Sequence, residues 1–345
     1  MAQQTAADTL GVPLPPRSLS DSPFLVRSVR NSLNFLRTKP LGAVGVFIIL
    51  LMVFAALTAP IISRYNPSTV FTSANPEFDP VLYEQSLTNP LIKVQNSTNK
   101  KLIKEGVLDQ WQGPSAKHWL GTDGFGHDLY ARIIYGSRLS LVVGIGGALI
   151  AVSLGIIFGL ISAYFGGLVD LLIQRVTDAF QAFPSLVLLL LFVQVVPDPN
   201  KWTITLALGI VGIAQVIRIV RGSVLQVREE VYVSAARVVG ATDLRVMIRH
   251  ILPNILAPII VIFTISIGIY ILAESGLAFI GLGDPGEISW GKMINEGRNN
   301  FAQPTMALFT GIAISLAVLG FNLAGDALRD ALDPRLRGRG NRAGF

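Results

Sequence analysis

The chain has 345 residues, of which 51% are hydrophobic and only 14% are charged. Soluble domains carry about 25% charged residues, so this composition excludes an ordinary soluble enzyme and a disordered protein and indicates a membrane protein. The chain has no cysteine and three scattered histidines, which argues against disulfides, a cysteine nucleophile and a metal site. Its net charge of +6 is therefore first tested as a topology signal rather than as a sign of nucleic-acid binding.

Stretches of about 20 residues without Lys, Arg, Asp or Glu predict membrane-spanning helices. The chain has six, which we place at 40–63, 139–169, 178–198 around Pro184, 201–218, 249–274 and 298–326. Backbone groups in lipid must be hydrogen-bonded internally, and no alternating ten-residue segments typical of a β-barrel occur, so the predicted fold is an all-α protein with six transmembrane helices.

The regions between these spans define the predicted domain organisation. We expect a disordered tail over 1–22, an N-terminal segment with the first span over 23–63, a long polar loop over 64–135, a transmembrane domain over 136–325 and a second tail over 326–345. The 64–135 loop is either a small subdomain or a solvated spacer.

Charge predicts the orientation of the spans. The side that holds both tails, the turn at 164–175 and residues 218–253 has 17 basic and, with Asp178 counted on it, 10 acidic residues, a net charge of +7. The other side has 11 of each, a net charge of 0. Because basic residues accumulate on the cytoplasmic side of membrane proteins, we expect both termini to be cytoplasmic.

The segment 221–253 is too long for a simple turn between two spans. It predicts a short helix over 229–239, which Gly240 ends, and a second helix that Asp243 caps and that Pro253 ends or kinks. The small Ala235 and Ala236 would allow another surface to approach closely. The residue pattern alone equally fits an amphipathic interfacial helix without a partner.

The sequence Ser-Ala-Ala-Arg-Val-Val-Gly at 234–240, followed by Leu252 and Pro253, resembles the EAA motif of permease subunits of ATP-binding-cassette (ABC) importers. Further segments at 119–141, 179–184, 274–283, 289–291 and 328–335 resemble the dipeptide and oligopeptide permeases of the OppC/DppC type. The resemblance covers about residues 24–70 and 117–338. The sequence departs from the family pattern in Ser234, where an acid is usual, in His127 and His250, and in a longer stretch at 71–116.

This resemblance implies the type I ABC importer permease fold and a plasma-membrane transport subunit rather than an enzyme. It also implies a heterodimer with a homologous permease, two ATP-binding subunits that hold ATP and Mg²⁺, and an extracytoplasmic solute-binding protein. The implied cargo is a di- or oligopeptide, with an oligosaccharide or nickel as alternatives. The residues expected to couple the chain to the ATP-binding subunits are Tyr232, Ser234, Ala235, Ala236, Arg237, Gly240, Ala241, Asp243, Leu252 and Pro253.

Two features need separate interpretations. Glu274 lies in a predicted span, where an acid is costly and is either functional or held by a structural hydrogen bond. Gly286 to Met293 has the spacing of a phosphate-binding loop, but Met293 replaces the Ser or Thr that such loops need, so we expect no nucleotide to bind there. An intramembrane enzyme, a proton-driven carrier and a scaffold or receptor are the other classes considered. The first two need several intramembrane acids, histidines or metal ligands, and a scaffold or receptor needs no coupling segment.

Overall fold

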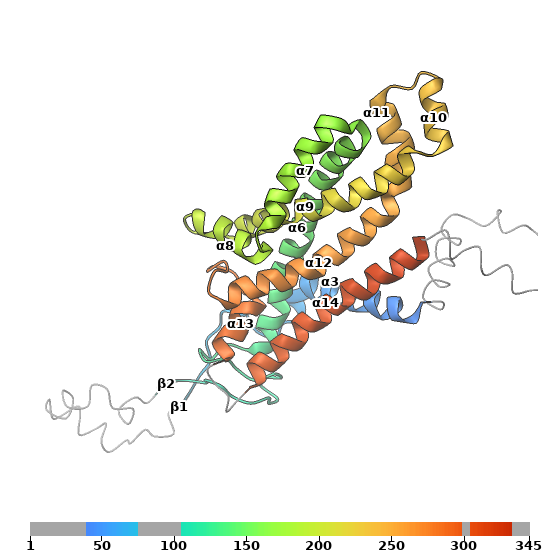
Figure 1. Cartoon of the computed structure of the whole chain (residues 1–345). Helices are drawn as coiled ribbons and strands as arrows, with labels where there is room; N and C mark the ends of the chain where they lie inside the picture. The colour runs from blue at the N-terminus through green and yellow to red at the C-terminus, as the bar shows by residue number, and fades with distance from the viewer. Residues whose placement is uncertain (1–38, 75–104, 299–303, 333–345) are drawn as a thin grey trace, which may run out of the picture.

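The computed structural model describes residues 39–74, 105–298 and 304–332, which form a helical bundle (Figure 1). The tail predicted over 1–22 lies outside the described residues. The elements are α3 (Pro40–Ile62), β1 (Thr72–Ala74), β2 (Glu105–Leu108), α6 (Leu129–Phe165), α7 (Gly167–Ala182), α8 (Ser185–Val195), α9 (Lys201–Arg228), α10 (Val231–Val238), α11 (Asp243–Arg245), π-helix η3 (Val246–Ile251), 3₁₀-helix η4 (Leu252–Ile255), α12 (Leu256–Phe279), α13 (Trp290–Gly297) and α14 (Thr305–Leu332).

The predicted spans correspond to helices of membrane-crossing length. Among the described residues, five helical segments are long and apolar enough to cross a bilayer. The pair α7 and α8 is a sixth candidate, so the expected count of six is met only with this bent pair. Helix α6 starts ten residues before the charge-free stretch and extends for about 55 Å, well beyond the roughly 30 Å of a hydrocarbon core.

The third predicted span is not one continuous helix. Helices α7 and α8 meet at an angle of 89° at the break around Pro184. Proline lacks an N–H and disfavours a helical conformation in the residue before it, and Phe183 is accordingly extended, with φ −94° and ψ 141°. The third predicted span is therefore a sharply bent pair of helices that meet at Pro184.

Glycines allow α6 and α9 to pack closely along their lengths. A Cβ atom on Gly155 would lie 2.6 Å from Val216 Cβ, and one on Gly159 would lie 2.8 Å from Val220 Cβ. Both pairs have the same sequence offset, so α6 and α9 run side by side in the same direction. Small residues at such contacts are the usual means of close helix packing in membranes.

Both ends of the described chain lie at the same end of the bundle. Lys39, just before α3, forms an ion pair of 2.7 Å with Asp330 near the end of α14. Arg329 and Leu332 line one cavity together with Asn254, so this end is also the one that carries α10 (Figure 1). We call it the α10 end. The opposite end carries α13 and the start of α6.

The long loop between α3 and α6 has an ordered base at the α13 end. Strands β1 and β2 pair in antiparallel fashion, with Thr72 opposite Leu108 and Ser73 opposite Val107. Residues 75–104, the centre of the loop, lie outside the described residues. The unusually long stretch at 71–116 is thus joined to the bundle through a two-stranded stem.

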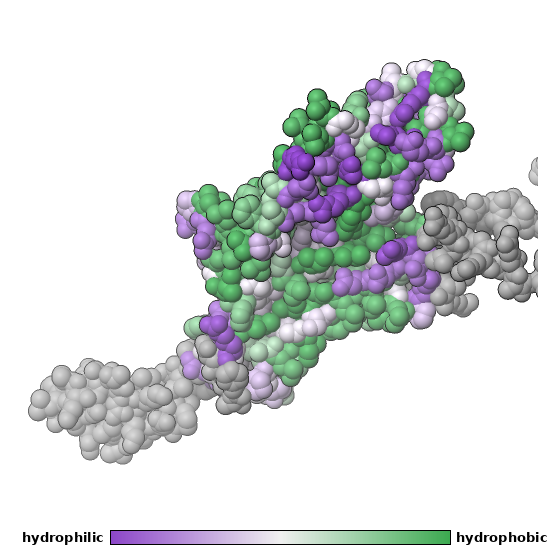
Figure 2. All heavy atoms as spheres, in the orientation of Figure 1, coloured by the Kyte–Doolittle hydropathy of each residue, from purple (hydrophilic) through white to green (hydrophobic). Residues whose placement is uncertain are grey.

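Hydrophobic and hydrophilic residues are unevenly distributed over the surface of the helical bundle. Hydrophobic residues cover most of α12 and α14, whereas hydrophilic residues gather over α10 and over part of α7 and α9 (Figure 2). The apolar surface is expected where lipid or another membrane subunit covers the helices.

Candidate functional site

The segment expected to carry function forms a projection at the α10 end. Helix α9 ends at Arg228, a short turn leads into α10, and α11 returns the chain toward η3 (Figure 1). Val233 is the buried anchor of α10. Val231, Val238 and Val239 are 82%, 88% and 88% exposed. Exposed apolar side chains at this density on a projecting helix are typical of a contact surface.

Gly240 ends α10, as the sequence predicts. Its φ is +89°, a left-handed conformation that L-residues with a side chain rarely adopt. The Gly240 N–H donates to Arg237 O at 2.9 Å, and the Ala241 N–H donates to Ala236 O at 3.0 Å. These two bonds form a Schellman motif, which satisfies the last carbonyls of the helix. A Cβ atom on Gly240 would meet nothing within 4 Å, so backbone conformation and not crowding requires glycine here.

A shallow depression of about 540 Å³ lies beside this turn. Five of the residues expected to couple the chain line it, namely Tyr232, Ala235, Ala236, Gly240 and Ala241. The lining also contains Val239, Arg245, Arg249 and His250, which are not among the residues expected to couple the chain. No acidic residue contributes, so the described lining is apolar with a positive rim. Partial burial and the nearby Glu230 carboxylate raise the pKa of Tyr232, so its phenol remains a neutral donor around pH 7.

The remaining predicted residues lie around the depression. Ser234 is exposed on α10, and Pro253 is exposed in η4. Leu252 and Pro253 begin the 3₁₀ turn that follows the π-helical turns of η3. The prediction that Pro253 ends or kinks the helix is met only in that the backbone is 3₁₀-helical here and the regular α-helix resumes at Leu256.

Asp243 does not cap the helix after Gly240. The N-cap position belongs to Thr242, and no side chain makes a capping hydrogen bond there. The Asp243 carboxylate instead accepts a hydrogen bond of 2.6 Å from the Tyr164 hydroxyl at the end of α6. The capping prediction is therefore wrong, because the helix begins at Asp243 itself and the N-cap falls one residue earlier, on Thr242.

Tyr164 joins the projection to the long helix α6. Besides its bond to Asp243, its ring lies 5.0 Å from the Arg237 guanidinium, a cation–π distance. Arg228, at the end of α9, donates to the carbonyl oxygens of Ala163 and Tyr164 at 2.8 and 3.3 Å. These contacts, which we call the Tyr164 clamp, tie α10 and α11 to α6. Helix α6 in turn reaches the α13 end.

Replacing Tyr164 will test this clamp. Tyr164→Phe keeps the ring under Arg237 but loses the bond to Asp243, at a cost of about 1 kcal/mol. Tyr164→Leu also loses the cation–π contact, worth about another 0.5–1 kcal/mol. We expect amide hydrogen exchange in α10 to rise modestly in the first variant and more in the second. Unchanged exchange in both would show that the clamp does not hold α10.

At the α13 end, acidic and basic side chains fix the start of α6. Asp128 caps α6 by accepting from the Ala131 N–H at 2.9 Å, and it also binds His118 Nδ1 at 2.8 Å. Arg132 donates to Asp123 and, at 3.0 Å, to Glu296 on α13. Asp123, Asp128 and Arg132 thus brace the start of the long α6.

Glu274 in α12 is buried and joins α12 to α13. Its Oε1 accepts from the Ser289 hydroxyl at 2.8 Å, and the same hydroxyl oxygen accepts from the Gly291 N–H at 3.1 Å. Ser289 therefore caps α13 while it binds Glu274. These contacts favour the structural role over that of a reactive acid.

Substitution of Glu274 separates the two roles. Glu274→Gln retains an acceptor for Ser289, so we expect thermal unfolding in detergent close to that of the wild type. Glu274→Leu leaves the buried hydroxyl without its acceptor, which costs about 1–3 kcal/mol. A stability of the glutamine variant as low as that of the leucine variant would show that the carboxylate charge itself is required.

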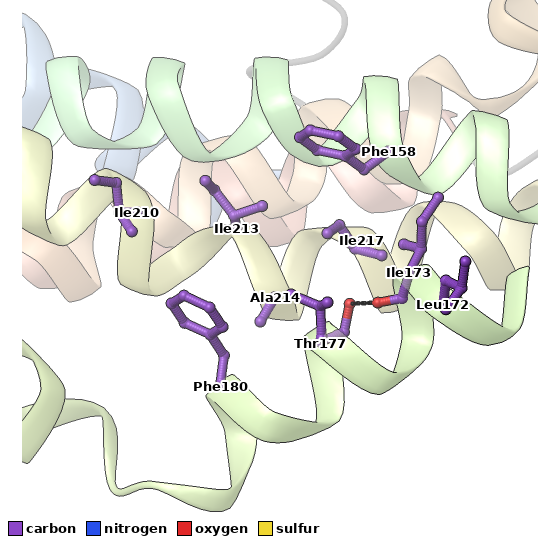
Figure 3. Close-up of a pocket in the computed structure, with 10 residues that line it drawn as sticks. Phe158, Leu172, Ile173, Thr177, Phe180, Ile210, Ile213, Ala214 and Ile217 are labelled. Atoms are coloured by element: carbon purple, nitrogen blue, oxygen red, sulfur yellow. Dashed lines mark hydrogen bonds between the residues drawn. The ribbon is translucent and has the colours of Figure 1, made fainter. Parts of the chain in front are cut away.

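An apolar pocket of about 350 Å³ lies between α6, α7 and α9. Figure 3 shows Phe158 from α6, Ile173, Thr177 and Phe180 from α7, and Ile213 from α9 around it. The Thr177 hydroxyl donates to Ile173 O at 2.8 Å and so leaves no unpaired polar group in the lining. The pocket suits an apolar group, not a metal or a nucleotide, and the described residues contain no cluster that could hold a metal ion.

Comparisons with known proteins identify the family. Residues 155–338 match the model of the binding-protein-dependent transport system inner membrane component. The chain is 43% identical over 243 residues to the dipeptide transport system permease protein DppC of Alkalihalophilus pseudofirmus, across 70% of this chain and 79% of that protein. It is 35% identical over 303 residues to the oligopeptide transport system permease protein OppC of Bacillus subtilis, across 87% of this chain and 88% of that protein.

A third relative has a different named cargo. The glutathione transport system permease protein GsiD of Pectobacterium atrosepticum is 40% identical over 228 residues, across 66% of this chain and 75% of that protein. With the apolar helices described above, these matches make the chain a multi-pass inner-membrane protein of the ABC permease type and not an enzyme. The chain belongs to the family of binding-protein-dependent transport system inner membrane components.

Proposed function

We propose that the chain is one of two membrane-spanning subunits of an ATP-driven importer for di- and oligopeptides. The second subunit is a homologous permease, and two ATP-binding subunits hold ATP and Mg²⁺. A solute-binding protein outside the membrane delivers the cargo. Peptide cargo is favoured because dipeptide, oligopeptide and glutathione permeases are among the chain's relatives.

One observation carries the proposal for coupling. Helix α10 projects from the bundle, exposes valines and ends at Gly240 beside a depression with a positive rim. Such a surface fits a partner that offers an apolar groove with acidic groups. We place the ATP-binding subunits at this surface, so Tyr232, Ser234, Ala235, Ala236, Arg237, Gly240 and Ala241 are the coupling residues. Asp243, Leu252 and Pro253 position them.

The same proposal sets the orientation. The α10 end is cytoplasmic, together with both termini, because the charge excess of +7 lies on this side. The α13 end and the loop 64–128 then face outward. When ATP closes its subunits, displacement of α10 passes through the Tyr164 clamp to α6 and tilts the bundle between inward-open and outward-open states. The energy comes from the different affinity of the ATP-bound subunits for the two states.

The test is reconstitution of the complex. The tagged chain is co-expressed with its neighbouring permease and ATP-binding genes, purified and placed in proteoliposomes with the solute-binding protein. We expect ATP-binding subunits to co-purify and trialanine uptake to require ATP. Uptake of nickel or an oligosaccharide in place of peptides would overturn the peptide cargo. Absence of any co-purifying ATPase would overturn the transporter assignment in favour of a carrier, an enzyme or a scaffold.

A further inference from the structure

Helix α9 carries a stripe of exposed residues that begins within its apolar part and continues into its charged end. Gln215, Arg218, Gly222 and Gln226 follow one another at intervals of three and four residues, which places them on one face of the helix. All four are exposed in this chain. Gln215 is 13 residues from Trp202 and 13 from Arg228, so it lies about 20 Å from either end of the helix. At the depth of Gln215 a polar side chain must meet water, another subunit or a ligand, because lipid cannot bind it.

The stripe borders two concave, partly polar regions. One, of about 530 Å³, lies at the α7–α8 break and is lined by Gln181, Ser185, Gln215 and Arg218 together with the rings of Phe180 and Phe183. The other, of about 640 Å³, lies at the α10 end and is lined by Ser223, Gln226, Asn254 and Arg329. Ile219 belongs to both linings, so the two regions follow each other along α9.

The chemistry of this track fits one class of ligand. Glutamine and asparagine amides can both donate to and accept from peptide bonds. Arg218 and Asp178 form an ion pair of 3.0 Å in which both side chains are about half exposed, which offers opposite charges to a zwitterion. The apolar pocket of Figure 3 shares Phe180 and Ala214 with the first region and provides space for an apolar side chain.

We infer that this face of α9, from the α7–α8 break to the α10 end, is the wall of the transport path that binds the peptide cargo through its main chain. This inference rests on the proposed function. It adds which residues of the chain bind the cargo and which part of the peptide they bind. Contact between the two permeases is less suited to the stripe, because concave polar surfaces are typical of ligand sites. A lipid acyl chain is also unsuited to the stripe, because it cannot form hydrogen bonds with the glutamine amides.

The absence of cysteine from the chain permits a direct test. Single variants Gln215→Cys and Gln226→Cys in the reconstituted complex are treated with a charged, membrane-impermeant methanethiosulfonate reagent. The control is Ile157→Cys, because the pairs Gly155–Val216 and Gly159–Val220 place this exposed residue of α6 at the depth of Arg218. Labelling is measured on this chain after separation of the subunits.

We expect both glutamine positions to react about tenfold faster than the control, since only a thiolate in contact with water reacts. We also expect labelled Gln215→Cys to lose trialanine uptake while ATP hydrolysis continues. Equal rates at Gln215 and Ile157 would overturn the inference, as would fast labelling that leaves uptake intact. Failure of the proposed function is distinguishable, because the unlabelled wild-type complex would then show no ATP-driven peptide uptake.

Discussion

A Gly240→Trp variant is expected to insert and assemble its helices normally and to lose ATP-driven uptake. Apart from the neighbouring residues, no atom of the described part of the chain lies within 4 Å of the position of its Cβ, so we expect the indole not to disturb the bundle. It would instead fill the depression beside α10, where we place the ATP-binding subunits. The left-handed φ of +89° adds a strain of about 1 kcal/mol for any residue with a Cβ.

Gly240→Ala is the matched control for this variant. It introduces the same backbone strain without the bulk, so we expect most uptake to remain. Measurements of ATPase co-purification and of peptide uptake in proteoliposomes separate the two effects. Normal uptake with Gly240→Trp would rule out docking at this surface. Equal loss in both variants would assign the effect to the Schellman turn instead.

The second large effect is expected for Gly155→Leu at the contact between α6 and α9. A Cβ here would lie 2.6 Å from Val216 Cβ, and the rest of the leucine side chain has no space between the two helices. Overpacking of a core costs about 1–3 kcal/mol or more, and here it would separate the longest helix from its main neighbour. We expect a strongly reduced yield of monodisperse protein and a lower unfolding temperature.

Gly311→Ala on α14 provides the comparison for Gly155→Leu. A Cβ at Gly311 would meet nothing within 4 Å, and alanine favours a helix over glycine by about 1 kcal/mol. This variant is expected to unfold at or above the wild-type temperature. If both variants behaved alike, close packing through Gly155 would not be required for the fold.

The sequence was sufficient to place the apolar spans, whose count of six depends on the bent pair of α7 and α8, but not to predict their shapes. Long stretches without charge mark α3, α9, α12 and α14, because the cost of placing charges in lipid is high. The break at Pro184 could be expected as a kink, since proline cannot donate a helix hydrogen bond. Its angle of 89° could not, because proline determines where the helix breaks and not how its two parts are oriented. The length of α6 was also underestimated, since Arg132 and Arg138 interrupt the apolar run while the helix continues.

The candidate site shows the same division between local and distant causes. Gly240 was predictable because a glycine after a short helix is the usual residue of a left-handed turn. The role of Tyr164 was not predictable. Tyr164 precedes Arg237 by 73 positions and Asp243 by 79, and only the fold brings these residues together. The polar stripe of α9 had a signal in the sequence, namely polar residues at intervals of three and four within an apolar span. Its exposure became visible only in the structure.

The most direct test of coupling at α10 is site-specific photo-crosslinking in the assembled transporter. A benzoylphenylalanine replaces Val239, which is 88% exposed at the depression, or Phe125, which is 54% exposed at the α13 end. We expect Val239 to crosslink to an ATP-binding subunit and Phe125 not to do so. A crosslink to that subunit from Phe125, with none from Val239, would contradict both the docking surface and the orientation.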